Sequence, residues 1–137
     1  MIAVQGAIDD TEGIIVIVTE ADVSDLVNIF KGGLERRIAF DGPPREYLGR
    51  VLDGLVVTVN DDALVRVCLK DGDIVIMGSR VALGRLASEL QLFVDSDDLN
   101  EPGMHTHFDP GQSTATSRRD ILMAEDSMPL MVAGPVY

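Results

Sequence analysis

The chain has 137 residues and a mass of 14.8 kDa, which suits one compact domain with a core of its own. Its 23 acidic and 11 basic side chains give a net charge of -12 at pH 7. This charge argues against partners such as nucleic acid or an anionic membrane surface, because both attract basic proteins. One cysteine, Cys68, leaves no internal disulfide, and no signal peptide or membrane-spanning stretch is recognisable. We therefore expect a cytoplasmic protein.

The first predicted elements are a buried strand and an amphipathic helix. Residues 14–18 are a run of Ile and Val, which is typical of a strand covered on both faces. Thr19 is placed to open a helix, and Gly32 is placed to end it. The apolar side chains between them recur at helical spacing: Val23, Leu26, Val27 and Phe30.

The next stretch predicts a short strand and a short second helix. Residues 35–41 suit a strand, which Pro43 and Pro44 must end. A proline also suits the first turn of a helix, and Gly54 suits a helix end. The helix is expected between them because Tyr47, Leu48, Val51 and Leu52 lie at helical spacing.

Three strands in the middle of the chain predict a β-meander. Residues 55–60, 63–70 and 73–78 are rich in β-branched side chains, and the dipeptide Asp71-Gly72 is a strong hairpin signal. The alternation in residues 63–70 places two sets of side chains on opposite faces. One set is Leu64, Arg66, Cys68 and Lys70, and the other is Val65, Val67 and Leu69.

The last third of the chain predicts a long helix followed by short strands. Ser79 is a suitable cap for a helix over residues 80–94. Residues 104–109 alternate like a strand, and residues 121–124 and 129–132 suit closing strands. Together the elements predict an α+β fold, with a mainly antiparallel sheet and two to three helices packed on it. We expect residues 1–137 to form one domain, with an N-terminal part (1–54) and a C-terminal part (55–137).

The sequence His105-Thr106-His107-Phe108-Asp109 is the strongest candidate for a chemical site. In a strand, His105, His107 and Asp109 project to one side, where two imidazoles and a carboxylate suit a divalent metal. The simpler interpretation is a polar strand face, with Met104, Thr106 and Phe108 packed into the core. Because the chain has no P-loop, dinucleotide-binding, HExxH, GxSxG or CxxC motif, we expect no catalytic site and no bound cofactor. Cys68 is interpreted as a buried strand residue rather than a nucleophile.

Residues 55–132 resemble a family of predicted immunity proteins from bacterial polymorphic-toxin systems, the family numbered thirty-two. The resemblance lies in the hairpin at Asp71-Gly72, the helix start at Gly78-Ser79-Arg80, the strand over residues 102–109 and the serine and apolar strand over residues 127–132. It implies a non-catalytic protein that neutralises a cognate toxin by direct binding. A net charge of -12 is the sign of charge that favours binding to such toxins, because many of them are nucleases with basic substrate channels.

These observations leave three hypotheses open. The first is an acidic binding protein of the immunity type, whose partner surface we expect to include the acidic loop with Asp95, Asp97 and Asp98 or the turn Asp61-Asp62. The second is a small metal-dependent enzyme or metal-binding protein that uses His105, His107 and Asp109. The third is a regulatory or structural subunit that forms a homodimer or a larger homo-oligomer.

Overall fold

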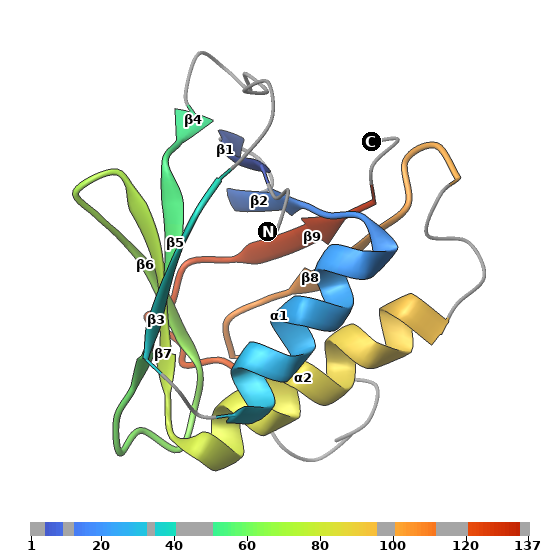
Figure 1. The fold of residues 1–137 in the computed structure, drawn as a ribbon. Coiled ribbons are helices and arrows are strands. Elements are labelled where there is room, and N and C mark those ends of the chain that lie inside the picture. The colour runs from blue at the N-terminus through green and yellow to red at the C-terminus, as the bar shows by residue number, and fades with distance from the viewer. Residues whose placement is uncertain are drawn as a thin grey trace.

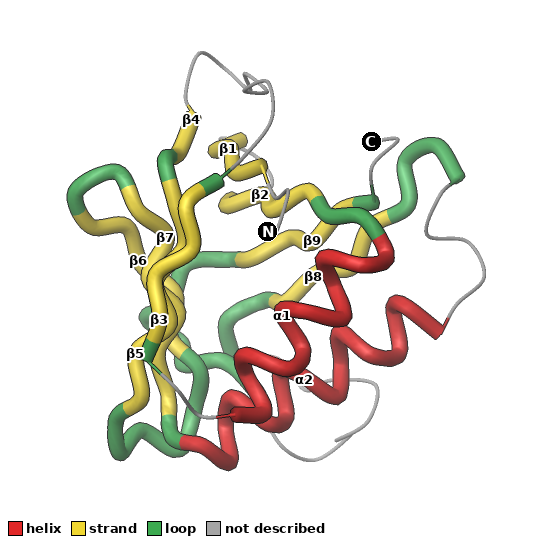
Figure 2. The backbone as a smooth tube through the Cα atoms, viewed as in Figure 1, coloured by secondary structure: helices red, strands yellow, loops and turns green. Residues whose placement is uncertain are grey.

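Two β-sheets and a pair of helices enclose the hydrophobic core in a computed structural model of the chain (Figure 1). The structure describes residues 5–9, 13–32, 35–40, 51–95, 101–111 and 121–134. The helices are α1 (Glu20–Gly32) and α2 (Arg80–Asp95), which pack against each other. One sheet stands upright at the left of the view, and the helices lie to its right, below the other sheet (Figures 1 and 2).

The five-stranded sheet contains strands from the beginning and from the end of the described chain. Its strand order is β4 (Val51–Leu52), β1 (Gln5–Asp9), β2 (Gly13–Ile17), β9 (Leu130–Ala133) and β8 (His105–Phe108). The neighbours are antiparallel except for β2 and β9, which run parallel. The predicted strands at residues 14–18, 104–109 and 129–132 are therefore confirmed. Residues 121–124 form isolated bridges, one of them between Met123 and Val65, rather than a strand of this sheet.

The four-stranded sheet corrects the predicted meander. Its order is β3 (Arg36–Ala39), β5 (Gly54–Val59), β7 (Asp73–Gly78) and β6 (Arg66–Lys70). All three meander strands exist, but β7 lies between β5 and β6 and runs parallel to β5. A central position suits β7 because Ile74, Val75 and Ile76 are all buried. An outer position suits β6, whose charged Arg66 and Lys70 stay at the surface.

The second helix predicted between Pro43 and Gly54 is wrong over its last residues. Val51 and Leu52 form β4, which pairs with β1, and Gly54 begins β5 rather than ending a helix. Residues 41–50 of this prediction lie outside the described residues. Val51 and Leu52 lie at helical spacing with the residues before them, but a β-branched run that favours a strand follows at once. Pairing with β1 makes these two residues a strand.

The fold is α+β, with one parallel pair in each otherwise antiparallel sheet. The main core gathers apolar side chains from both helices and both sheets, among them Ile14, Phe30, Leu55, Ile74, Leu83 and Leu130. The expected cap of α2 is confirmed, because the Ala82 amide donates to the Ser79 hydroxyl oxygen at 3.2 Å. Within the described part of the chain, neither helix has the length and apolar character needed to cross a bilayer.

Candidate functional site

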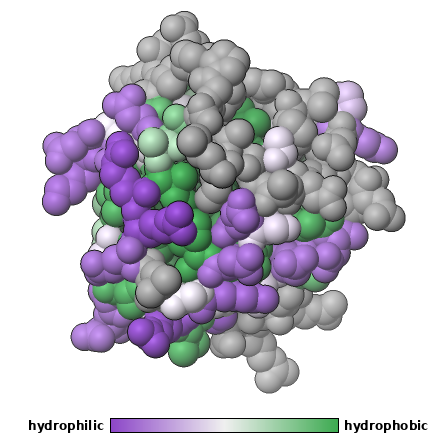
Figure 3. Space-filling view, in the orientation of Figure 1, coloured by the Kyte–Doolittle hydropathy of each residue, from purple (hydrophilic) through white to green (hydrophobic). Residues whose placement is uncertain are grey.

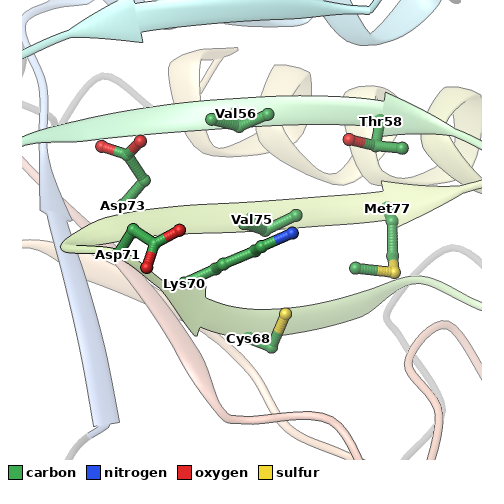
Figure 4. Close-up of a pocket in the computed structure, with 8 residues that line it drawn as sticks. All are labelled: Val56, Thr58, Cys68, Lys70, Asp71, Asp73, Val75 and Met77. Atoms are coloured by element: carbon green, nitrogen blue, oxygen red, sulfur yellow. The ribbon is translucent and has the colours of Figure 1, made fainter.

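The side of the four-stranded sheet that faces away from the helices carries a shallow pocket of about 320 Å³ (Figure 4). We call this side the outer face. Its pocket is lined by eight side chains from β5, β6, β7 and the turn between the last two: Val56, Thr58, Cys68, Lys70, Asp71, Asp73, Val75 and Met77. The volume lies at the small end of the range for ligand pockets, and the pocket is open to solvent. It therefore suits side chains that project from a partner better than an enclosed small molecule.

The middle of the outer face is apolar. Val56, Val75 and Cys68 lie side by side in register across β5, β7 and β6, and Thr58 and Met77 form the next row. These side chains are half-buried, apart from Val75, which is 9% exposed. In Figure 3 the surface at the left, where this sheet lies, is mostly hydrophilic with smaller hydrophobic areas. An apolar centre of this kind within a polar rim is the usual layout of a protein interface.

One end of the outer face is closed by an ion pair that crosses a strand. The Arg37 guanidinium on β3 donates to both carboxylate oxygens of Asp73 on β7, at 3.1 and 2.9 Å. Between them lies Gly54 of β5, where a Cβ atom would sit 3.0 Å from Arg37 Nη2 and 3.1 Å from Asp73 Oδ1. The missing side chain of Gly54 thus leaves room for the pair. The hydrogen bond to Asp73 raises the pKa of Arg37 above its ordinary value, so this residue stays charged.

The opposite end carries a second arginine held by two carboxylates. Arg66 on β6 pairs with Asp62 at 2.7 Å and with Asp126 at 3.0 Å. Its pKa is raised above the ordinary value, first through the hydrogen bond to Asp126 and its charge. The Asp62 amide donates to the Asn60 side-chain oxygen at 2.9 Å, and the Asp62 carbonyl accepts from the Ser79 amide at 2.8 Å. The loop at this end is therefore anchored to the start of α2.

Two of the charged side chains that line the pocket form no ion pair with any described residue: Lys70 and Asp71. The Lys70 side chain runs between Val75 and Cys68 and directs its nitrogen away from Asp71 and Asp73 (Figure 4). Asp71 occupies the hairpin turn with a φ of 53° and is exposed. Around the outer face as a whole, carboxylates outnumber basic groups: Asp53, Asp61, Asp62, Asp71, Asp73 and Asp126 against Arg37, Arg66 and Lys70.

The structure places His105 and His107 on the polar side of β8, as the simpler sequence interpretation expects. Both imidazoles are exposed, whereas Phe108 is 4% exposed and belongs to the main core. The two rings meet edge to face with centroids 4.7 Å apart, and His105 Nδ1 lies 2.7 Å from the Gly103 carbonyl oxygen. Asp109 lies beyond the end of β8. Among the described residues, no group of three or more potential ligands gathers around a point that would hold a metal.

The two acidic segments predicted as alternative partner surfaces lie far apart in their described residues. Asp61 and Asp62 lie beside the start of α2, whereas Asp95 is its last residue. Because α2 has 16 residues, its ends are about 24 Å apart. Asp97 and Asp98 lie outside the described residues. Of the predicted partner residues, Asp61 and Asp62 therefore border the outer face, and Asp95 is remote from them.

Sequence reasoning missed the outer face as a site. Cys68 was expected to be buried, but it is half-exposed and lines the pocket. The signal was the alternation in residues 63–70, which places Arg66, Cys68 and Lys70 on one face. The contributions from β5 and β7 could not be assigned without the strand order.

Comparisons of this chain with protein families, with curated proteins and with solved structures found no significant match.

Proposed function

We propose that this chain is a non-catalytic acidic binding protein that neutralises a bacterial toxin by direct contact, in the manner of an immunity protein. The observation that carries the proposal is the outer face, where half-exposed apolar side chains are surrounded by a rim richer in carboxylates than in basic groups. A partner that covers this face removes the apolar centre from water, which favours association.

Charge supports the same proposal. A chain with a net charge of -12 attracts a basic protein over a distance of several ångströms, and this attraction raises the rate of encounter. Toxins that cut nucleic acid need a basic channel for their substrate, so an acidic inhibitor can occupy that channel. Two copies of this chain would instead bring like charges together, and this disfavours a homodimer formed through the outer face.

The decisive experiment searches the genes beside this chain for a toxin and uses an inactive form of it as the binding partner. Titration calorimetry should give a one-to-one complex with the wild-type chain, and active toxin should be inhibited at the same ratio. Met77→Glu places a charge beside the apolar middle of the outer face and should abolish the complex. Leu92→Glu is the matched control, because Leu92 is 47% exposed on α2, away from the sheet.

Absence of binding by the wild-type chain would overturn the proposed function. If wild type binds and Met77→Glu binds equally well, the function stands and the outer face is the wrong surface. Circular dichroism of both variants separates loss of binding from loss of folding.

A further inference from the structure

We propose that the outer face receives an extended segment of its partner that carries an apolar side chain at its centre and a basic side chain at each end. This inference rests on the proposed function, because it names the chemistry of the partner at the same surface. It follows from the spacing of the side chains, from the charges at the two ends and from the place of Lys70.

The spacing comes from the strands. Asp73, Val75 and Met77 alternate along β7, so that they project from the same side, and Lys70, Cys68 and Arg66 face them in register on β6. Four residues of a strand separate Asp73 from Met77, a distance of about 13 Å. An extended partner segment has the same two-residue repeat. Its residues i, i+2 and i+4 can therefore meet one end, the middle and the other end of the face.

The middle of the face fits an apolar side chain. Val56 and Val75 form the floor of the pocket, and Met77 and Thr58 lie at one side (Figure 4). The open pocket of about 320 Å³ admits one large aliphatic or aromatic side chain with part of its backbone.

Both ends of the face fit a positive charge. At the hairpin end, three carboxylates (Asp53, Asp71 and Asp73) lie near two basic groups: Arg37, which pairs with Asp73, and Lys70, which lies opposite Asp73 in register on β6. At the opposite end, Arg66 is shared by Asp62 and Asp126, and exposed Asp61 is adjacent in sequence. Each end thus retains at least one negative charge that is not matched by a described basic group.

Removing the charge of Lys70 tests whether the partner segment is basic or acidic. Its stem covers part of the apolar floor, and its ammonium group opposes a basic partner. If the partner segment is basic, removing this charge should strengthen binding, while removing Asp71 should weaken it. An acidic segment would give the reverse of both effects.

The probe is a capped synthetic heptapeptide with leucine at its centre, lysine two residues to either side, and serine and glycine elsewhere. Its binding to the isotope-labelled full-length chain is followed by NMR. Amide shifts should concentrate in β5, β6 and β7. Lys70→Gln should tighten binding and Asp71→Asn should weaken it, each by about two- to fivefold, the range for one exposed ion pair. Asp95→Asn, at the far end of α2, is the matched control and should have no effect.

Two control peptides complete the experiment. One has glutamate in place of both lysines, and the other has serine in place of leucine; both should bind more weakly than the lysine–leucine peptide. No shifts on the outer face, or stronger binding of the glutamate peptide, would overturn the inference. Neither result bears on the toxin titration, so a toxin complex that forms through another surface would leave the proposed function intact.

Discussion

The two sheets differ in how much of the face that points away from the helices is exposed to solvent. On the five-stranded sheet, Ile15, Met131 and Ala133 lie on that face and have no exposed surface, and Ile17 is 6% exposed. On the four-stranded sheet, the corresponding face holds the half-exposed Cys68 and Met77 and a charged rim. The first face contributes to stability through burial, whereas the second is free to contact a partner. Substitutions on the two faces should therefore differ in their effects on stability.

The largest effect is expected from matched methionine substitutions on the two faces. Met131→Ala removes a fully buried side chain and should lower the free energy of unfolding by about 2–5 kcal/mol. Met77→Ala, on the half-exposed face, should lower it by about 1 kcal/mol or less. Urea unfolding curves measure both. Equal losses would mean that the two faces are buried alike.

The ion pair between Arg37 and Asp73 passes over Gly54 of β5, which has no side chain to block it. Gly84, on α2, provides the control. In Gly54→Ala the new Cβ would lie 2.9 Å from the Ile38 carbonyl oxygen, so β3 must shift, at a cost of about 1–3 kcal/mol. Gly84→Ala adds a methyl group in open space within α2 and should stabilise the chain by about 0.5–1 kcal/mol. The thermal midpoints of the two variants should therefore move in opposite directions. A rise for Gly54→Ala would contradict the close approach of β3 and β5.

The edge of β6 that faces away from β7 is held by a buried hydroxyl, beside a backbone hydrogen bond from the Met128 amide to the Val67 carbonyl oxygen. The Val67 amide donates to Ser127 Oγ at 2.8 Å, and Ser127 is 7% exposed. Ser127→Ala leaves that amide without its partner and should cost about 1–3 kcal/mol in urea unfolding. Ser88→Ala, on the exposed side of α2, should change stability by no more than about 0.5 kcal/mol. If the two serines proved equivalent, the hydroxyl would not be what fastens β6.

The smallest effect is expected at the imidazoles of β8. His107 is exposed, so His107→Ala should change the free energy of unfolding by about 0.5 kcal/mol or less. Metal analysis of protein purified without chelator should give the same content for variant and wild type. One equivalent of metal in wild type that disappears in His107→Ala would instead favour the metal-binding hypothesis.

The sequence was most informative where one pattern dominates. The Ile and Val run at residues 14–18 predicted a strand buried on both faces, and Ile14 and Ile15 are indeed both fully buried on opposite sides of β2. The serine cap and apolar stripe of α2 were predicted for the same reason. Val51 and Leu52 were misassigned because helical spacing over two turns is weaker than pairing with β1, which no local pattern reports.

The sequence held signals of the candidate site without identifying the site itself. Asp61, Asp62 and the exposed alternation of β6 were available in the sequence, and all three border or form the outer face. The loop that begins at Asp95 and the turn at Asp61 and Asp62 were predicted as alternative partner surfaces, and the sequence could not tell how far apart they lie. The length of α2 separates them.

By itself the sequence determined the class of fold, most of the elements and the acidic character of the chain, because hydrophobic period, caps, turns and charge are local properties. The tertiary structure alone decided that β7 enters between β5 and β6. That insertion brings Val56, Val75 and Cys68 into one row and lets Arg37 reach Asp73 over Gly54. Strand order depends on contacts between residues far apart in the chain, and these contacts produce the outer face.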